Sequence, residues 1–346
     1  MSVYTPLSHN EICSFFEPFK LGSVLNYEAT ETGIENTNYF LTSSQKEHFV
    51  LTLFESTTDE DLPSFVELMA HLEGANLPIA APIADANGNR IHKIKNKPAM
   101  LCPRLAGKHI QNPSLIHCEQ IGTVMANLHL ATADYPENSL TDYTLPWAQQ
   151  QIPSLLAPSK PRPSKPGLSK QEPSNKSDFL SQSDAALLQD ISQRCDQFLK
   201  TYHELPSGII HGDLFYDNAL FTSSNGQDIL SGVIDFYQSG PGFLIYDLAV
   251  AANDWCLDNS KSAGEIVLDR NKVNALIGAY EKNRPLNNIE KKAWPQMLVF
   301  SAYRFWISRL LNKLKAENNN SVSNHPIKNP NQFRNLMQSN RRYWTL

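Results

Sequence analysis

Two carboxylates and one amide, spaced around a short loop, restrict the fold and chemistry of this chain more than any other feature. Asp213 follows the apolar run 208–210, and Asn218 comes five positions after it, so one loop can present both side chains. Asp235 ends a second apolar run, 229–234, and would project from the tip of a buried strand. A site that transfers a phosphoryl group needs one carboxylate beside the attacking hydroxyl, and an amide and a second carboxylate on the metal ions. The pattern therefore predicts phosphoryl transfer to an alcohol.

Each residue of this pattern has a simpler interpretation when it is taken alone. A lone Asp213 would be explained best as a turn residue that caps a helix. His211 is expected to brace the loop rather than to act as an acid or base, and Asp217 is expected to be a surface charge. The spacing to Asn218 and the strand-like run before Asp235 favour a common site over these separate explanations.

Length, charge and cysteine spacing limit the class of protein. A chain of 346 residues suits two lobes better than one ordinary core, and the net charge of −5 argues against a general nucleic-acid binder. No apolar run approaches the roughly 20 residues that span a bilayer, and the N-terminus lacks the features of a secretory signal. The five cysteines never form C-x-x-C and are typical of reduced thiols. We therefore expect a cytoplasmic protein without nucleic-acid or membrane partners, whose oligomeric state stays open.

The first hundred residues are predicted to form strands and one helix. Segments 37–42 and 48–54 are rich in aromatic and β-branched residues and flank a polar turn, which indicates a hairpin. Segment 61–72 has its apolar residues at helical spacing. Asn87-Gly88 predicts a type I′ turn between two further strands, the second of which ends at 98–102.

The second part of the chain is predicted to be mainly helical, with one segment of different composition. Helical spacing begins after residue 112 and returns from 184 to 203. Between them, residues 151–184 are crowded with Pro, Ser and Lys and poor in apolar side chains. Such a segment buries too little surface to offset its ordering entropy, so we expect a disordered surface insert. A PxxP docking motif is the less favoured alternative.

Further motifs show which family the chain resembles. His-Gly-Asp-x-x-x-x-Asn with a later Ile-Asp-Phe, together with Asn-Leu-His at 127–129 and Tyr-Asp-Leu-Ala at 246–249, is the signature of the aminoglycoside and choline kinase group of protein-kinase-like phosphotransferases. Within that group the chain is most similar to the homoserine kinases, over about 4–311. The segments that carry this narrower resemblance are 33–40, 49–55, 60–63, 235–237, 253–256 and 304–309.

The resemblance implies an α+β, two-lobed protein-kinase-like fold with ATP and Mg²⁺ between the lobes. A small, mainly β N-terminal lobe would comprise residues 1–104, and a larger, mainly helical C-terminal lobe residues 105–346. Asp213 would be the catalytic base, and Asn218 and Asp235 would hold Mg²⁺. The residues implied for the nucleotide are Gly33, Asn36, Thr37 and Asn38 of the loop over the phosphates, Thr52 of the third strand, and Cys102, Arg104 and Leu105 of the hinge.

One position departs from the usual kinase pattern. A kinase usually carries a Lys on its third strand that clamps the α- and β-phosphates, and this chain has Thr52 there. The partner role of Glu67 on the following helix is therefore in doubt. Arg104 and the metal ions are the candidates for neutralising the phosphates.

The resemblance implies ATP-dependent phosphorylation of the homoserine side-chain hydroxyl, in threonine synthesis. An amino acid needs a cation for its carboxylate and a carboxylate or aromatic face for its ammonium group. Arg304 has two equally supported interpretations, a substrate contact and a buried ion pair with Asp247 or Asp254. The acceptor-site candidates are Tyr237, Asp254, Trp255 and Arg304.

Two other functions stay open. The first is a related kinase for choline, an aminoglycoside or methylthioribose. The second is a non-catalytic binding protein on a kinase fold, which Thr52 suggests and the intact Asp213, Asn218 and Asp235 oppose.

Overall fold

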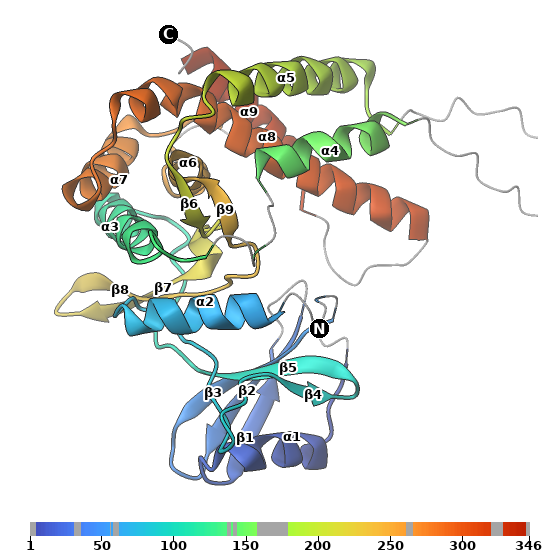
Figure 1. The fold of residues 1–346 in the computed structure, drawn as a ribbon, viewed down its shortest axis with the longest axis vertical. Helices are drawn as coiled ribbons and strands as arrows, with labels where there is room; N and C mark the ends of the chain where they lie inside the picture. The colour runs from blue at the N-terminus through green and yellow to red at the C-terminus, as the bar shows by residue number, and fades with distance from the viewer. Residues whose placement is uncertain are drawn as a thin grey trace, which may run out of the picture.

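The protein folds into an N-terminal sheet and a larger, mostly helical part, which lie one above the other (Figure 1). The structure is a computed structural model. It describes the chain in the ranges 5–30, 36–55, 57, 62–136, 140, 144–157, 179–260, 266–319 and 328–343. Within these ranges no helix is both long enough and apolar enough to cross a membrane.

The N-terminal part is a five-stranded antiparallel sheet in the order β1-β2-β3-β5-β4. Its strands are β1 (Val24–Ala29), β2 (Thr37–Ser43), β3 (His48–Leu53), β4 (His92–Ile94) and β5 (Lys97–Pro103). Helix α1 (His9–Phe16) and the short 3₁₀ turn η1 (Glu17–Phe19) precede the sheet, and helix α2 (Leu62–Gly74) joins β3 to β4. The predicted β2–β3 hairpin and the predicted helix are confirmed.

The predicted type I′ turn at Asn87-Gly88 was wrong. That turn type needs positive φ at both central residues, and of the two only Gly88 has it, at +89°. The condition is met at Lys95 and Asn96, with φ of +52° and +63°, which connect β4 directly to β5. The earlier turn is built instead around Asp85, whose carboxylate accepts the N–H groups of residues 87 and 89.

The two faces of the sheet have different partners because side chains alternate along a strand. Leu51 and Leu53 of β3 are fully buried on the face that α1 covers. Thr52 points to the opposite face, where it lies in register with Asn38 and Met100. This second face packs against α2 and looks toward the helical part (Figure 1).

The helical part contains two small sheets and seven helices among the described residues. The strand pairs are β6 (Ser207–Ile210) with β9 (Gly240–Phe243), and β7 (Ala219–Ser224) with β8 (Gln227–Val233). The 3₁₀ turn η3 (Tyr216–Asn218) precedes β7. The helices are α3 (Leu115–Ala131), α4 (Leu145–Leu156), α5 (Gln182–Thr201), α6 (Leu244–Trp255), α7 (Arg270–Asn283), α8 (Asn288–Asn319) and α9 (Asn331–Tyr343).

The predicted bounds of the disordered insert, 151–184, were too wide. Residues 151–156 continue α4, and 182–184 form the first turn of α5. Ile152 and Leu155 lie three residues apart on α4 and are buried in the main core, so the few apolar side chains of this segment are enough to dock its end. Residues 158–178, which carry most of the Pro, Ser and Lys, lie outside the described ranges.

Two backbone contacts join the segments after α2 and after β5 to strands β8 and β7, which flank the site. Val233, the last residue of β8, donates its N–H to the carbonyl of Pro78 at 2.8 Å, after α2. Lys108, which follows β5, and Phe221 exchange backbone hydrogen bonds at 2.9 Å. Gly107 has φ of +126°, and a Cβ atom there would lie 2.9 Å from the Phe221 carbonyl oxygen. A glycine is therefore required where the chain turns into the helical part.

Candidate active site

The loop after β6 brings the predicted base and the predicted amide ligand together. The side-chain N–H₂ of Asn218 donates to the Asp213 carbonyl at 2.8 Å and to Asp213 Oδ2 at 3.4 Å. This orientation leaves the amide oxygen of Asn218 to bind a cation. The backbone N–H of Ile234 donates to the Asn218 carbonyl at 3.0 Å, which places the following residue, Asp235, beside the loop.

Asp235 adopts an unusual backbone conformation. Its φ is +67°, in the left-handed region that residues other than glycine rarely occupy, and its side chain is exposed. The next residue, Phe236, is buried against the ring of His211 at 4.7 Å between centroids. The backbone keeps this conformation because Phe236 is buried while the neighbouring carboxylate is exposed. Strained backbone conformations of this kind are common at functional sites.

The electrostatics of Asp213 fit a site completed by a cation. Burial raises the pKa of Asp213 well above its ordinary value, the nearby Asp235 carboxylate raises it further, and Arg304 opposes both. Carboxylate and amide oxygens are ligands that Mg²⁺ prefers, and the ion commonly takes only one or two protein ligands with phosphates and waters. In the described part of the chain no three His, Cys, Asp or Glu side chains gather to bind a metal. Asn218 and Asp235 therefore fit a metal shared with phosphates.

His211 braces the loop, as predicted. Its Nε2–H donates to the Ile234 carbonyl at 3.1 Å, and its Nδ1 accepts the backbone N–H of Asp213 at 3.3 Å. One nitrogen donates and the other accepts, which is the neutral imidazole. Burial lowers the pKa of His211, in agreement with that form.

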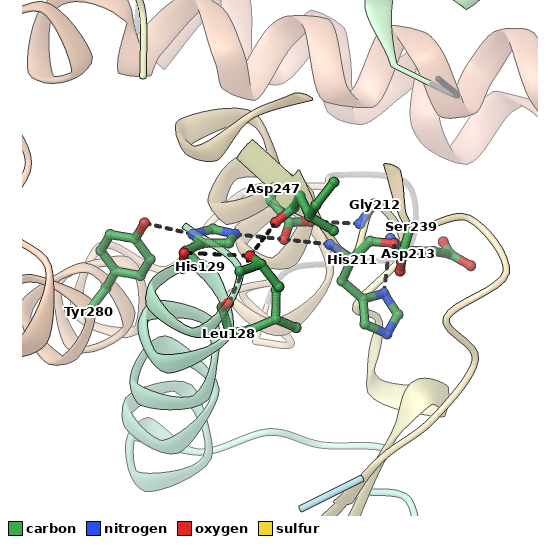
Figure 2. A network of polar contacts seen from close by, with 10 residues as sticks. Leu128, His129, His211, Gly212, Asp213, Ser239, Asp247 and Tyr280 are labelled. Carbon is green, nitrogen blue, oxygen red and sulfur yellow. Dashed lines mark hydrogen bonds and ion pairs between the residues drawn. The ribbon is translucent and has the colours of Figure 1, made fainter. Parts of the chain in front are cut away.

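A buried carboxylate on α6 holds the backbone of the same loop (Figure 2). Asp247 Oδ2 accepts the N–H of His211 at 3.0 Å, and Oδ1 accepts the N–H of Gly212 at 2.8 Å. His129, on α3, has its Nε2 3.0 Å from Asp247 Oδ2 and its Nδ1 2.7 Å from the Tyr280 hydroxyl. Since a carboxylate only accepts, His129 Nε2 carries the proton. The network orients the loop, and the Asp213 side chain points away from it (Figure 2).

On the nucleotide side, Thr52 and Asn38 form one polar unit on the face of the sheet that looks toward the helical part. The Thr52 hydroxyl donates to Asn38 Oδ1 at 2.8 Å. Asn36 Oδ1 accepts the N–H of Glu55 at 3.4 Å. The Thr37 hydroxyl is buried on the other face and donates to Glu55 at 2.6 Å, which does not support the predicted nucleotide contact of this side chain. Gly33 lies outside the described residues.

The residues predicted to form the hinge lie at the end of β5 and directly after it. Burial raises the pKa of the Cys102 thiol to about 12, so it is a neutral core residue, and Leu105 packs beside it. The Arg104 guanidinium is exposed and lies 3.6 Å from the ring centroid of Phe40.

Of the residues predicted for the acceptor site, some lie at the catalytic loop and others are packed elsewhere. Trp255 is fully buried and donates its indole N–H to the Leu214 carbonyl at 2.9 Å, so it supports the loop and is not a pocket wall. Tyr237 packs edge-on against Phe54 at 5.0 Å between centroids, on the side of the N-terminal sheet. Neither placement supports the predicted contact with an acceptor. Asp254 lies at the loop, where its Oδ2 accepts the N–H of Tyr216 at 2.7 Å.

Arg304 forms neither of the ion pairs considered for it, among the contacts within the described residues. Its guanidinium donates to the Gln238 side chain and lies 5.2 Å from the ring centroid of Trp147. Asp247 is occupied by His129 and the backbone of the loop. Burial raises the pKa of Asp254 to about 7, whereas nearby Lys328 and Arg309 lower it.

Two cations near this loop, Arg309 and Lys328, had no role predicted from the sequence. Arg309 stands at the end of the motif 304–309, which was the one available signal. Lys328 lies 3.5 Å from Asp217, and both side chains are largely exposed, so Asp217 is a surface charge, as predicted, that pairs with Lys328.

Comparison with known proteins identifies the family. The profile of the phosphotransferase enzyme family matches residues 27–286. The chain belongs to this family. A homoserine kinase of Cupriavidus pinatubonensis is 37% identical over 317 residues, 90% of this chain and 88% of that protein. A homoserine kinase of Burkholderia lata is 35% identical over 316 residues, 90% of this chain and 87% of that protein.

Solved structures of other kinases share the fold. An amicoumacin kinase bound to AMP-PNP, Ca²⁺ and amicoumacin aligns with a TM-score of 0.65, over 97% of this chain and 94% of that one, at 12% identity. A Plasmodium vivax ethanolamine kinase aligns with a TM-score of 0.63, over 96% and 87% of the two chains, at 15% identity. At these identities the similarity establishes the two-lobed protein-kinase-like fold alone.

Proposed function

We propose that the protein phosphorylates the side-chain hydroxyl of L-homoserine with ATP and Mg²⁺, giving O-phospho-L-homoserine for threonine biosynthesis in the cytoplasm. The observation that carries the acceptor is the identity of 35–37% to homoserine kinases over 90% of this chain. The chemistry is supported by the cluster of Asp213, Asn218 and Asp235 in one loop region. All five cysteines are free, which suits a reducing compartment.

Asp213 is the proposed base and positioner. The hydroxyl oxygen attacks the γ-phosphorus, the bond to the bridging β–γ oxygen breaks, and ADP leaves with the electron pair. The hydroxyl proton passes to the Asp213 carboxylate. Asn218 Oδ1 and Asp235 would hold Mg²⁺, which when bound neutralises charge on the phosphates. Because little covalent catalysis is needed, the residues contribute mainly by position and charge.

The nucleotide is proposed to bind between residues 1–104 and residues 105–346. The polar unit of Thr52 and Asn38 stands where most kinases carry the phosphate-clamping Lys. We propose that these two side chains bind a phosphate oxygen by hydrogen bonds, together with Gly33 and Asn36. The backbone of Cys102 to Leu105 would meet the adenine edge, with Arg104 and Phe40 stacked at its margin.

A zwitterionic acceptor requires a cation and a carboxylate near Asp213. Asp254 is the proposed partner of the ammonium group, since one of its oxygens is engaged by Tyr216 and the other is left to accept. Arg304 stays a candidate for the carboxylate by its position near Asp213, although it is only 2% exposed.

The test is turnover with a panel of alcohols, measured by ADP release with ATP and Mg²⁺. L-homoserine should give the highest kcat/KM, and the product should be O-phosphohomoserine by phosphorus NMR. 4-Hydroxybutyrate and 4-aminobutan-1-ol should be very poor substrates, since each leaves one charged group of the site unpaired. A higher kcat/KM with choline, methylthioribose or an aminoglycoside would refute the assignment of the acceptor.

A further inference from the structure

The C-terminal segment, residues 328–343, contacts the catalytic loop although it lies beyond residues 27–286, which the family profile matches. Phe333 is 4% exposed, and its ring stacks on Phe215 of the loop at 5.9 Å between centroids. The same ring stacks on Phe305 of α8 at 5.1 Å. Lys328 lies 3.5 Å from Asp217 of the loop. The segment therefore adds an aromatic and an ionic contact within four residues of Asp213.

The C-terminal segment also orients Arg309, which projects from α8. Arg309 donates to the carbonyl of Asn329 at 2.9 Å and to the Gln332 side chain at 2.8 Å. Its guanidinium lies 4.3 Å from the ring centroid of Phe333. Both hydrogen bonds leave from Nη1, so among the described contacts Nε and Nη2 are left to donate. A planar guanidinium held in this way is prepared to bind a carboxylate with two parallel hydrogen bonds.

The charges around Arg309 indicate what it faces. Burial lowers its pKa, while the carboxylates of Asp254, Asp213 and Asp217 oppose the change. The guanidinium is therefore half-buried in the field of the catalytic base and of the proposed ammonium partner, Asp254. Arg304 is much less accessible and is engaged by Gln238, in the loop after Asp235. Of the two arginines, Arg309 is the more accessible one.

We propose that Arg309, held in place by the C-terminal segment, binds the α-carboxylate of the acceptor amino acid. Asp254 would bind the ammonium group of the same molecule, and its hydroxyl would then reach Asp213. The inference deepens the proposed function and rests on it. In this arrangement the C-terminal segment contributes to the acceptor site, and Arg304 positions the loop that contains Gln238.

The test compares L-homoserine with its neutral amide, L-homoserinamide, in the full-length protein and in Arg309→Gln. A charge-assisted hydrogen bond of this kind should make KM for homoserine rise about 10- to 150-fold in the variant. KM for ATP should be unchanged, and kcat/KM for homoserinamide should change by less than about threefold. The wild-type preference for the acid over the amide should therefore nearly vanish.

Two further variants separate binding from folding. Arg309→Lys keeps the cation and loses the fork, so it should retain part of the preference for the acid. Gln332→Ala removes one tether from the C-terminal segment and should raise KM for homoserine by less than Arg309→Gln does. The matched control is Arg194→Gln, on the exposed face of α5, where Arg194 pairs with Asp190 in the same helix. It should leave both acceptors unaffected.

The outcomes distinguish this inference from the proposed function. Failure of the wild-type protein to phosphorylate homoserine would remove both. Turnover of homoserine by the wild type, with the acid-over-amide preference intact in Arg309→Gln, would overturn the role of Arg309 alone. An equal loss for acid and amide would also overturn it, because a merely structural arginine would affect both. If Arg309→Gln does not fold, an unchanged preference in Arg309→Lys and Gln332→Ala would overturn the role of Arg309 in the same way.

Discussion

The buried pair of His129 and Asp247 should be essential for both stability and turnover. Asp247→Asn removes a carboxylate that accepts two backbone N–H groups and one imidazole N–H. An asparagine retains one accepting oxygen and places an N–H₂ group against remaining donors. Each buried donor that loses its acceptor costs about 1–3 kcal/mol, so the loss of acceptors for two of the three donors costs roughly 2–6 kcal/mol. We therefore expect Asp247→Asn to lower the free energy of unfolding by about that amount.

The chain contains a matched control for this prediction. His117 and Asp228 are 3.1 Å apart, against 3.0 Å for His129 and Asp247, but the Asp228 side chain is 39% exposed and that of Asp247 only 1%. An exposed pair contributes about 0–1 kcal/mol. Asp228→Asn should therefore cost less than about 1 kcal/mol and leave turnover unchanged, since the Asp228 side chain is much more exposed and the backbone of the catalytic loop donates to Asp247.

The measurements are urea unfolding followed by tryptophan fluorescence, and kcat with saturating substrates. Displacement of the loop by about 1 Å should lower kcat in Asp247→Asn by about 10²-fold. Equal losses of stability in Asp247→Asn and Asp228→Asn would refute the reasoning from burial. An unchanged kcat in a folded Asp247→Asn protein would show that the loop does not depend on this carboxylate.

The difference in unfolding free energy between wild type and Asp247→Asn should depend on pH, because the folded protein shifts the pKa of Asp247. Burial acts to raise this pKa, but the hydrogen bonds that the Asp247 carboxylate accepts from His129 and from the Gly212 N–H lower it. A lowered pKa in the folded state means that the stabilisation is present above the unfolded pKa of about 3.9, and is lost as the pH falls through the folded value. The gap between wild type and Asp247→Asn should shrink below about pH 4. A gap that widens there would contradict the sign.

Three other changes test the catalytic assignments and the insert. Asp213→Asn should lower kcat by several orders of magnitude while calorimetry still shows nucleotide binding, and turnover within about tenfold of wild type would contradict its role. Asp235→Ala should abolish turnover and the Mg²⁺ dependence of ATP affinity, so an affinity that still rises with Mg²⁺ would place the metal elsewhere. Replacing residues 158–178 with a short Gly-Ser bridge should leave kcat and Tm nearly unchanged. A large fall in either would show that this segment docks on the fold.

Local patterns in the chain predicted the parts of the fold that depend on neighbouring residues. The β2–β3 hairpin and α2 follow from side-chain periodicities of two and about three and a half, and both were placed correctly. Composition was a weaker guide. The Pro-rich stretch 158–178 led to an insert drawn too wide, because two apolar residues, Ile152 and Leu155, suffice to dock the end of α4.

For the site as well, contacts between residues close in sequence were predictable, and contacts between distant residues were not. Asp213 and Asn218 are five residues apart, so a short loop presents them together, and their proximity could be predicted from the chain alone. His129 and Asp247 are separated by 118 positions, and nothing in the local pattern around either residue indicates that they meet. The approach of α3, α6 and the C-terminal segment to one loop depends on how helices pack, which is a property of the whole core. For that reason the contacts of His129 and Asp247 that hold the loop, and the contacts of Arg309 with the C-terminal segment, are seen in the folded protein and could not be predicted from its sequence.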